Sequence, residues 1–254
     1  MSFSDDLNAC AAIVQKGDPW RFRTVMAAPV DARAKLFPLY AFNVEVSRAP
    51  WVTAEPMIAE MRLQWWRDAL EEIGADGKVR RHEVVSPLAD VLSTQDVERL
   101  DQLIAARRWD CYKDPFEDDA ALDQYLQHTA GHLMVCAAGL LGPTQGPIRG
   151  ADQAGYGAGV AAFLRAIPGL VAQKRIPLVD GTPDGVRALA ARGLASLNQA
   201  RNLAPKSSAP AFWPVMGAEK CLKFVLKHPA SVADGPLPQP GGVLFAVKAA
   251  LGRW

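Results

Sequence analysis

Apolar residues that recur at every fourth position constrain this chain more than any other feature. The pattern runs from Met57 to Ile73, in the segment MIAEMRLQWWRDALEEI, with charged side chains off the apolar positions. A repeat close to 3.6 residues places one apolar stripe along a helix, so the segment is predicted to be an amphipathic helix. Pro56 suits the first turn of this helix, and Gly74 suits the position just past its end.

Similar periodicity, or an apolar run with polar caps, continues along most of the chain. It predicts further helices over residues 31–47, 96–111, 119–141, 153–170, 184–204, 213–227 and 242–251. Pro38 lies inside the first of these and predicts a kink or a later start. No segment alternates apolar and polar residues between hairpin turns. We therefore expect an all-α fold in one domain over residues 1–254, with weaker helical patterns after residue 200.

Composition and charge exclude several classes of protein. Half of the 254 residues are apolar and 22% are charged, which is typical of a globular protein and not of a disordered one. The net charge of +1 gives no sign of a nucleic-acid partner. The four cysteines form no CxxC pair, and no stretch of 18 uncharged apolar residues is present. We expect a cytoplasmic protein without a secretory signal, at most peripheral on the inner membrane.

The C-terminal third is the one region that suggests a surface partner. Basic residues outnumber acidic ones from Arg201 to Trp254, and this region includes an apolar segment over 243–251. Such a segment would suit contact with a membrane surface. An ordinary last helix packed on the bundle is the alternative, and the sequence favours it.

No metal site or catalytic residue is predicted. His128 and His132 share one helix face with Cys136, but Thr129 stands where a metalloprotease of this spacing has glutamate. Acidic pairs at helical spacing lie in polar segments and suit solvated faces: Asp68/Glu72, Asp114/Asp118 and Asp119/Asp123. For His128 and His132, the favoured interpretation is an interior helix on which both side chains are satisfied within the fold. The GxSxG motif is absent, and nothing ties a serine or cysteine to a particular histidine.

Three cations near residue 170 are candidates for binding an anion. Arg165 interrupts the apolar run GVAAFLRAIPGL, and Lys174 and Arg175 follow it. A buried charge needs a partner, so Arg165 either pairs with an acid such as Glu45 or faces a cavity that receives an anion. Together the three could bind a diphosphate or an acidic lipid headgroup, although structural ion pairing is favoured.

Three stretches of the chain resemble the squalene/phytoene synthase family. They are LFPLYAFNVEVSRAPW over 36–51, MRLQWWRDAL over 61–70, and GAGVAAFLRAIPGLVAQKRIPLV over 157–179, and the helix over 125–141 fits between the last two. The resemblance covers roughly residues 10–200. It implies the all-α isoprenoid-synthase bundle, with a central cavity lined by the helices that carry Tyr40, 125–132 and 157–165.

The two aspartate-rich motifs of that family have no counterpart in this sequence. The first, of the type Asp-Asp-x-x-Asp, aligns with Ser-Arg-Ala-Pro-Trp over 47–51. The second, Gln-x-x-Asn-x-x-Arg-Asp-x-x-x-Asp, keeps its arginine as Arg165 and has Gly159, Ala162, Ala166 and Leu170 at its other positions. The family's reaction ionises an allylic diphosphate and needs carboxylates to hold Mg²⁺. The resemblance therefore implies a relative without normal turnover and without a cofactor.

The segment Leu164–Pro168 resembles the branch of the family that includes a mitochondrial complex I assembly factor and also lacks the aspartates. The resemblance implies a non-catalytic protein in a bacterium, which binds a prenyl diphosphate or isoprenoid lipid, or contacts respiratory-complex subunits. We expect its cavity to be lined by the following residues: Tyr40, Glu45, Arg48, His128, Arg165, Lys174 and Arg175.

Two alternatives remain open. The first is an active prenyl transferase that makes squalene- or phytoene-like products, with carboxylates such as Glu45 holding Mg²⁺. The second is an assembly scaffold without a ligand, whose cavity would be filled by Trp and Phe side chains.

Overall fold

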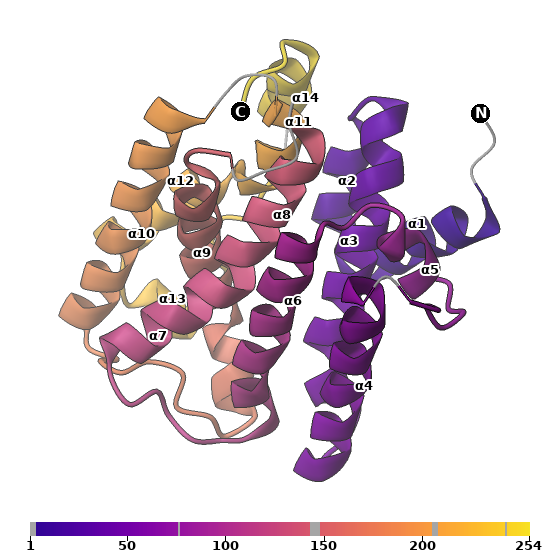
Figure 1. Ribbon diagram of the computed structural model, residues 1–254. Helices are drawn as coiled ribbons and strands as arrows, with labels where there is room; N and C mark the ends of the chain where they lie inside the picture. Colours follow the sequence, from indigo (N-terminus) through magenta and orange to yellow (C-terminus); the bar gives the residue numbers. More distant parts are fainter. Residues whose placement is uncertain (1–3, 76, 143–147, 205–207, 242) are drawn as a thin grey trace.

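The computed structural model describes residues 4–75, 77–142, 148–204, 208–241 and 243–254. Every regular element in these ranges is a helix, so the prediction of an all-α fold is confirmed. Figure 1 shows the long helices standing side by side as a bundle, with α11 and α14 at one end of it.

The long helices follow the predicted boundaries closely. They are α3 (Val30–Arg48), α4 (Pro56–Gly74), α6 (Thr94–Arg107), α7 (Asp119–Leu126), α8 (His132–Leu141), α9 (Ala151–Ala172) and α10 (Pro183–Leu203). Helix α3 begins before Pro38 and continues through it, so a late start is wrong. Helix α6 ends at Arg107, and a 3-10 turn over Arg108–Cys111 completes the segment that was predicted as one helix.

Five other helices were not predicted from the sequence. They are α1 (Asp5–Gly17), α2 (Pro19–Met26), α5 (Val85–Ala89), α11 (Ala209–Phe212) and α13 (Ser231–Asp234). The start of α1 had a visible signal, because Ser4 caps it by accepting a hydrogen bond from the Leu7 backbone and two aspartates follow. The predicted helix over 213–227 is wrong in its first turn. Gly217 has a left-handed φ of 97°, which ends the turn over Trp213–Val215 and starts α12 (Ala218–Lys227).

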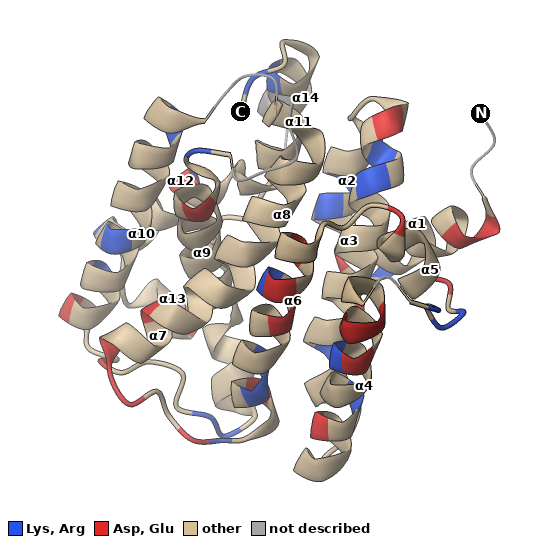
Figure 2. Ribbon diagram, in the orientation of Figure 1, with Lys and Arg blue, Asp and Glu red and all other residues tan. Residues whose placement is uncertain are grey.

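One contiguous apolar core contains buried side chains from every helix between α1 and α13. Helix α9 lies at its centre and packs against α8, α10 and α12. By length and composition α9 could also cross a membrane, but more than half of its apolar window is buried inside the bundle. Helix α14 (Val243–Ala250) joins a smaller cluster, in which Phe245 packs on Trp20 and Trp213. Figure 2 shows no charged residue on α8, whereas the outward faces of α4 and α6 carry both signs.

A π-helical segment over Gln127–Gly131 joins α7 to α8, so the predicted long helix over 119–141 is continuous but not uniform. Within it, the Thr129 hydroxyl donates to the Tyr125 carbonyl at 2.7 Å. A π segment inserts one residue into the helical repeat and changes which side chains face inward. This segment borders the central cavity.

Candidate functional site

The centre of the bundle holds a cavity with two adjoining lobes. The larger lobe has a volume of about 540 Å³ and the smaller lobe about 250 Å³. Both are bordered by Arg21, Ala130, Leu133, Gly159 and Ala162, so they are neighbours across these residues. The larger volume lies in the range of about 300–1,000 Å³ that is typical of small-ligand pockets. A scaffold without a ligand would have this cavity filled by Trp and Phe side chains, and the cavity is instead open.

Helices α3 and α9 present uncharged faces to the larger lobe. On α3, Asn43 and Ser47 are one turn apart and line it together. On α9, Gly159, Ala162 and Ala166 line it, and both alanines are exposed to the open space. No carboxylate faces the cavity from either helix among the residues that line the two lobes.

The charges of the larger lobe neutralise one another. Arg107 Nη1 lies 3.0 Å from Asp110 Oδ2 and donates to the Tyr125 hydroxyl at 2.9 Å. The Tyr125 hydroxyl donates in turn to Asp110 Oδ1 at 3.0 Å. Burial is the main reason that the pKa of Tyr125 is well above its usual value, so this hydroxyl stays protonated. Both oxygens of Asp110 are therefore engaged, while the Nε of Arg107 has no acceptor within the described chain.

A second ion pair borders both lobes. Arg21 Nη1 lies 2.5 Å from Asp18 Oδ2, and its guanidinium lies 5.4 Å from the centre of the Tyr40 ring. Asp18 also caps α2 by accepting a hydrogen bond from the Arg21 backbone. The Tyr40 hydroxyl is buried and has no hydrogen-bond partner within the described chain. Burial raises the pKa of Tyr40 to about 12, so it is a donor without an acceptor.

Arg165 faces the smaller lobe, as the interpretation of a cavity-facing cation expected. Its Nε donates to the Pro238 carbonyl at 3.0 Å, and its Nη2 donates to the Gly217 carbonyl at 3.4 Å. Burial lowers the pKa of Arg165, because no carboxylate is near enough to offset the loss of solvation. Pairing with Glu45 is therefore wrong for this arginine.

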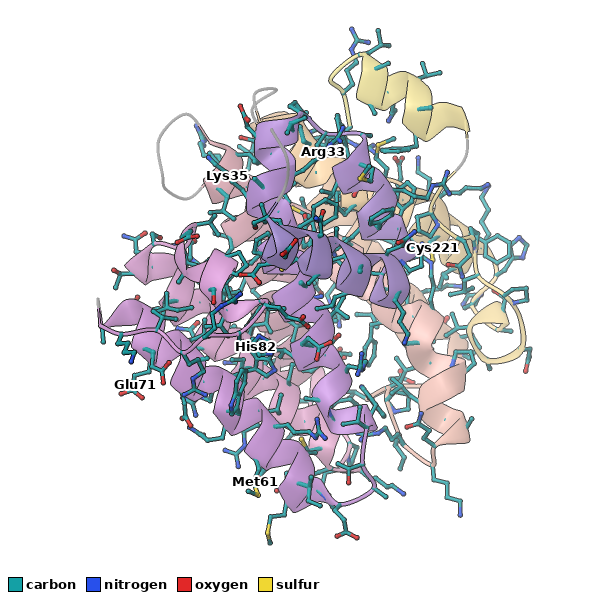
Figure 3. All side chains as sticks on the ribbon, turned by 90° about the vertical axis from the view of Figure 1, so that its right-hand side faces the viewer. Arg33, Lys35, Met61, Glu71, His82 and Cys221 are labelled. Carbon is teal, nitrogen blue, oxygen red and sulfur yellow. The ribbon has the colours of Figure 1, made fainter. Side chains whose placement is uncertain are left out.

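Glu45 and Arg48 do not line the cavity. Residues 45 and 47 are about 200° apart around a helix, so Glu45 points away from the side that Ser47 occupies. The two residues form a 3.4 Å ion pair and line a separate groove of about 560 Å³ between α3 and α4. Figure 3 labels two other residues of this α3–α4 groove, Met61 at the lower edge of the molecule and His82 higher up.

His128 is also absent from the residues that line the two lobes. Its ring stacks on that of His132 at 4.8 Å between centres. His132 Nδ1 lies 3.2 Å from the Arg99 carbonyl, and burial lowers the pKa of His132. Of the two histidines that the sequence predicted to be satisfied, His132 has this polar contact, and His128 is described by its ring stacking.

Lys174 and Arg175 do not converge with Arg165. Arg175 is buried at 8% exposure, and it donates to the carbonyls of Asp110 and Tyr112. Its guanidinium also lies 4.8 Å from the Trp51 ring centre. Lys174 is exposed and adopts a left-handed φ of 62° just after α9 ends. Because the carbonyls and aromatic rings already satisfy Arg175, the three cations cannot bind one diphosphate.

The donors in the cavity do not suit Mg²⁺. Asp18 and Asp110 are the carboxylates that line the two lobes, and each is held by an arginine. Across the described ranges, no group of three or more His, Cys, Asp or Glu side chains could hold a metal ion together. A magnesium site for a diphosphate needs several carboxylate oxygens aimed at one point.

Sequence reasoning found Arg165 but missed the other four charged residues of the cavity. Asp18 and Arg21 lie at the start of α2, Arg107 is the last residue of α6, and Asp110 lies in the turn that follows. The one available signal was the spacing of opposite charges by three residues, Asp18/Arg21 and Arg107/Asp110. That spacing is common on solvated helices, so it does not identify a cavity.

Comparison with known proteins supplies a family and relatives. A family model described as squalene/phytoene synthase matches residues 14–179. A Drosophila melanogaster protein named NADH dehydrogenase (ubiquinone) complex I, assembly factor 6 homolog is 28% identical over 177 residues, which are 67% of this chain and 53% of that protein. The Homo sapiens complex I assembly factor 6 is 24% identical over 161 residues, which are 63% of this chain and 48% of that protein. The chain thus spans about half the length of the curated relatives it matches.

Two solved structures share the fold. A dehydrosqualene synthase in complex with ligand has a TM-score of 0.71 at 18% identity, over 88% of this chain and 87% of that chain. A squalene synthase from Alicyclobacillus acidocaldarius also has a TM-score of 0.71, at 17% identity, over 88% of this chain and 94% of that chain. The prediction of an isoprenoid-synthase-type bundle is therefore confirmed.

Proposed function

Because the chain belongs to the squalene/phytoene synthase family, we propose that it is a non-catalytic member that keeps the cavity and binds an isoprenoid there. The observation that carries this proposal is the uncharged character of the α3 and α9 faces. Ser47, Ala162 and Ala166 occupy these faces, and none of them supplies a carboxylate to hold a metal ion that neutralises a departing diphosphate.

The role that we propose is assembly of a respiratory complex I. The curated relatives named as complex I assembly factors support it, because they match 63–67% of this chain. The match spans about half of each relative, so partner subunits that those proteins contact elsewhere are not implied for this chain.

An active prenyl transferase has less support from the geometry. That alternative relied on Glu45 as a magnesium ligand. Glu45 instead lies in the α3–α4 groove, paired with Arg48 at 3.4 Å. The structural likeness to two synthases supports the fold, and at 17–18% identity it carries no activity to this chain.

We also propose a cytoplasmic protein in peripheral contact with a membrane through the C-terminal helix. In support, Phe245 anchors α14 to the bundle while Val247 is 51% exposed and Leu251, just past the helix, is 62% exposed. Sedimentation with phospholipid vesicles tests this contact, and a protein that stays in the supernatant would exclude it.

Deletion of the gene in its own organism tests the assembly role. We expect less assembled complex I on native gels and lower NADH:ubiquinone oxidoreductase activity, both restored by the wild-type gene. Ala162→Trp would fill the cavity and should fail to restore them. Ala195→Trp is the control, since Ala195 is exposed on α10. Normal complex I in the deletion strain would overturn the assembly role.

A further inference from the structure

We infer that the ligand of the cavity is a single-chain lipid whose head accepts hydrogen bonds and carries at most one negative charge. It is not a diphosphate ester. This inference rests on the proposed function, because it names the class of isoprenoid that the same cavity would bind. The argument comes from the charges that line the two lobes and from one unpartnered hydroxyl.

The charge of the cavity is close to balanced. Three arginines and two aspartates line the two lobes: Arg21, Arg107, Arg165, Asp18 and Asp110. Two of the arginines are already paired with the two aspartates, at 2.5 Å and 3.0 Å. One positive charge is left. A diphosphate carries more negative charge than one cation offsets, and burying the excess without a metal ion is unfavourable.

The unpaired positive charge and the unpartnered hydroxyl both belong to residues of the smaller lobe. Arg165 borders the smaller lobe, where two backbone carbonyls hold its guanidinium and no carboxylate neutralises it. Tyr40 borders the same lobe, and its hydroxyl has no partner in the described part of the chain. An unsatisfied buried donor costs about 1–3 kcal/mol, which an acceptor on a ligand would recover. The smaller lobe therefore suits an oxygen head group such as a hydroxyl, a carbonyl or a carboxylate.

The larger lobe suits the apolar chain of such a lipid. Leu126, Leu133, Phe163 and Leu170 line it, and the small residues Gly159 and Ala162 leave room along α9. Its one carboxylate, Asp110, is engaged by Arg107 and Tyr125, and the Nε of Arg107 and the Nε1 of Trp109 have no acceptor within the described chain. A hydrocarbon chain can lie against these walls without breaking a hydrogen bond.

Binding of three farnesyl compounds to the purified full chain tests the inference. Calorimetry would compare farnesol, farnesoic acid and farnesyl diphosphate, each with and without Mg²⁺. We expect the alcohol and the acid to bind at least tenfold more tightly than the diphosphate, with no effect of Mg²⁺. Tightest binding of the diphosphate, or binding that needs Mg²⁺, would overturn the inference and leave isoprenoid binding intact. Failure of all three to bind would instead overturn the proposed isoprenoid-binding function.

Substitutions of Tyr40 and Arg165 test whether the head group of the ligand lies in the smaller lobe. Tyr40→Phe removes the free donor and keeps the ring, so farnesol and farnesoic acid should bind about three- to tenfold more weakly. Arg165→Met removes the cation and should weaken the binding of farnesoic acid more than the binding of farnesol. Arg165→Lys keeps a cation that can still hold the C-terminal segment. Tyr156→Phe is the matched control, because the Tyr156 hydroxyl donates to Asp123 at 2.6 Å and does not line either lobe. Unchanged affinities in Tyr40→Phe would contradict a head group in the smaller lobe.

Discussion

At the scale of single residues, both carboxylates that line the cavity are paired with an arginine. Asp110 is 2% exposed and accepts hydrogen bonds from Arg107 and Tyr125. A buried ion pair contributes little over an apolar substitute, but removal of one partner leaves a buried charge uncompensated. This asymmetry makes the network sensitive to any single change.

Asp110→Ala should destabilise the protein by about 3 kcal/mol, because it leaves the half-buried Arg107 unpaired and removes the acceptor of the Tyr125 hydroxyl. Chemical denaturation followed by circular dichroism measures this free energy of unfolding. Asp184→Ala is the control: the Asp184 side chain is 92% exposed and its pair with Arg187 is on the surface. That change should cost less than about 1 kcal/mol. Equal effects of the two substitutions would contradict a buried network.

The ion pairs of Glu219 should make stability depend on pH. Hydrogen bonds from Arg201 and Lys223 lower the pKa of Glu219 to about 2. A carboxylate with a lowered pKa stabilises the folded state above its unfolded pKa of about 4.3, and this contribution is lost as the pH falls toward 2. Glu219→Gln should therefore lower the melting temperature at pH 7, and the difference from wild type should shrink below pH 4. Glu98→Gln, at an exposed position of α6, is the control and should leave the melting temperature at pH 7 close to that of the wild type.

At the scale of elements, most helices could be predicted but their inward faces could not. Apolar periodicity placed α4 within one residue at each end, because its stripe from Met57 to Ile73 is long and bounded by Pro56 and Gly74. The family resemblance put Glu45 in the cavity, since it identified the helix but not which side of α3 meets α4. The sequence also gave no indication of the π segment over Gln127–Gly131, which depends on packing against α9.

Close packing of α9 on that π segment requires a glycine at position 155. A Cβ there would lie 2.6 Å from the Ala130 carbonyl oxygen and 2.7 Å from the Gly131 Cα. Gly155→Ala should therefore destabilise the protein by about 1–3 kcal/mol, since backbone atoms would have to move. Gly169→Ala on the same helix is the matched control. No atom lies within 4 Å of its added Cβ, so the change should be neutral or stabilising by up to about 1 kcal/mol. Thermal unfolding should show a lower melting temperature for Gly155→Ala and an unchanged or higher melting temperature for Gly169→Ala.

At the scale of the whole molecule, a continuous core joins α1 to α13 around α9. We propose on this ground that residues 1–254 form one domain, as the sequence led us to expect. Near- and far-ultraviolet circular dichroism should then melt in a single coincident transition. A separate transition for the C-terminal region after residue 200 would contradict this.

We propose above all that this cavity binds an isoprenoid and cannot ionise a diphosphate. Release of inorganic diphosphate from farnesyl diphosphate by the purified protein, with Mg²⁺ and NADPH, tests that claim most directly. An active squalene synthase under the same conditions is the positive control. We predict no release above the rate without protein. Mg²⁺-dependent release at an enzymatic rate would contradict the account and identify the chain as a working prenyl transferase.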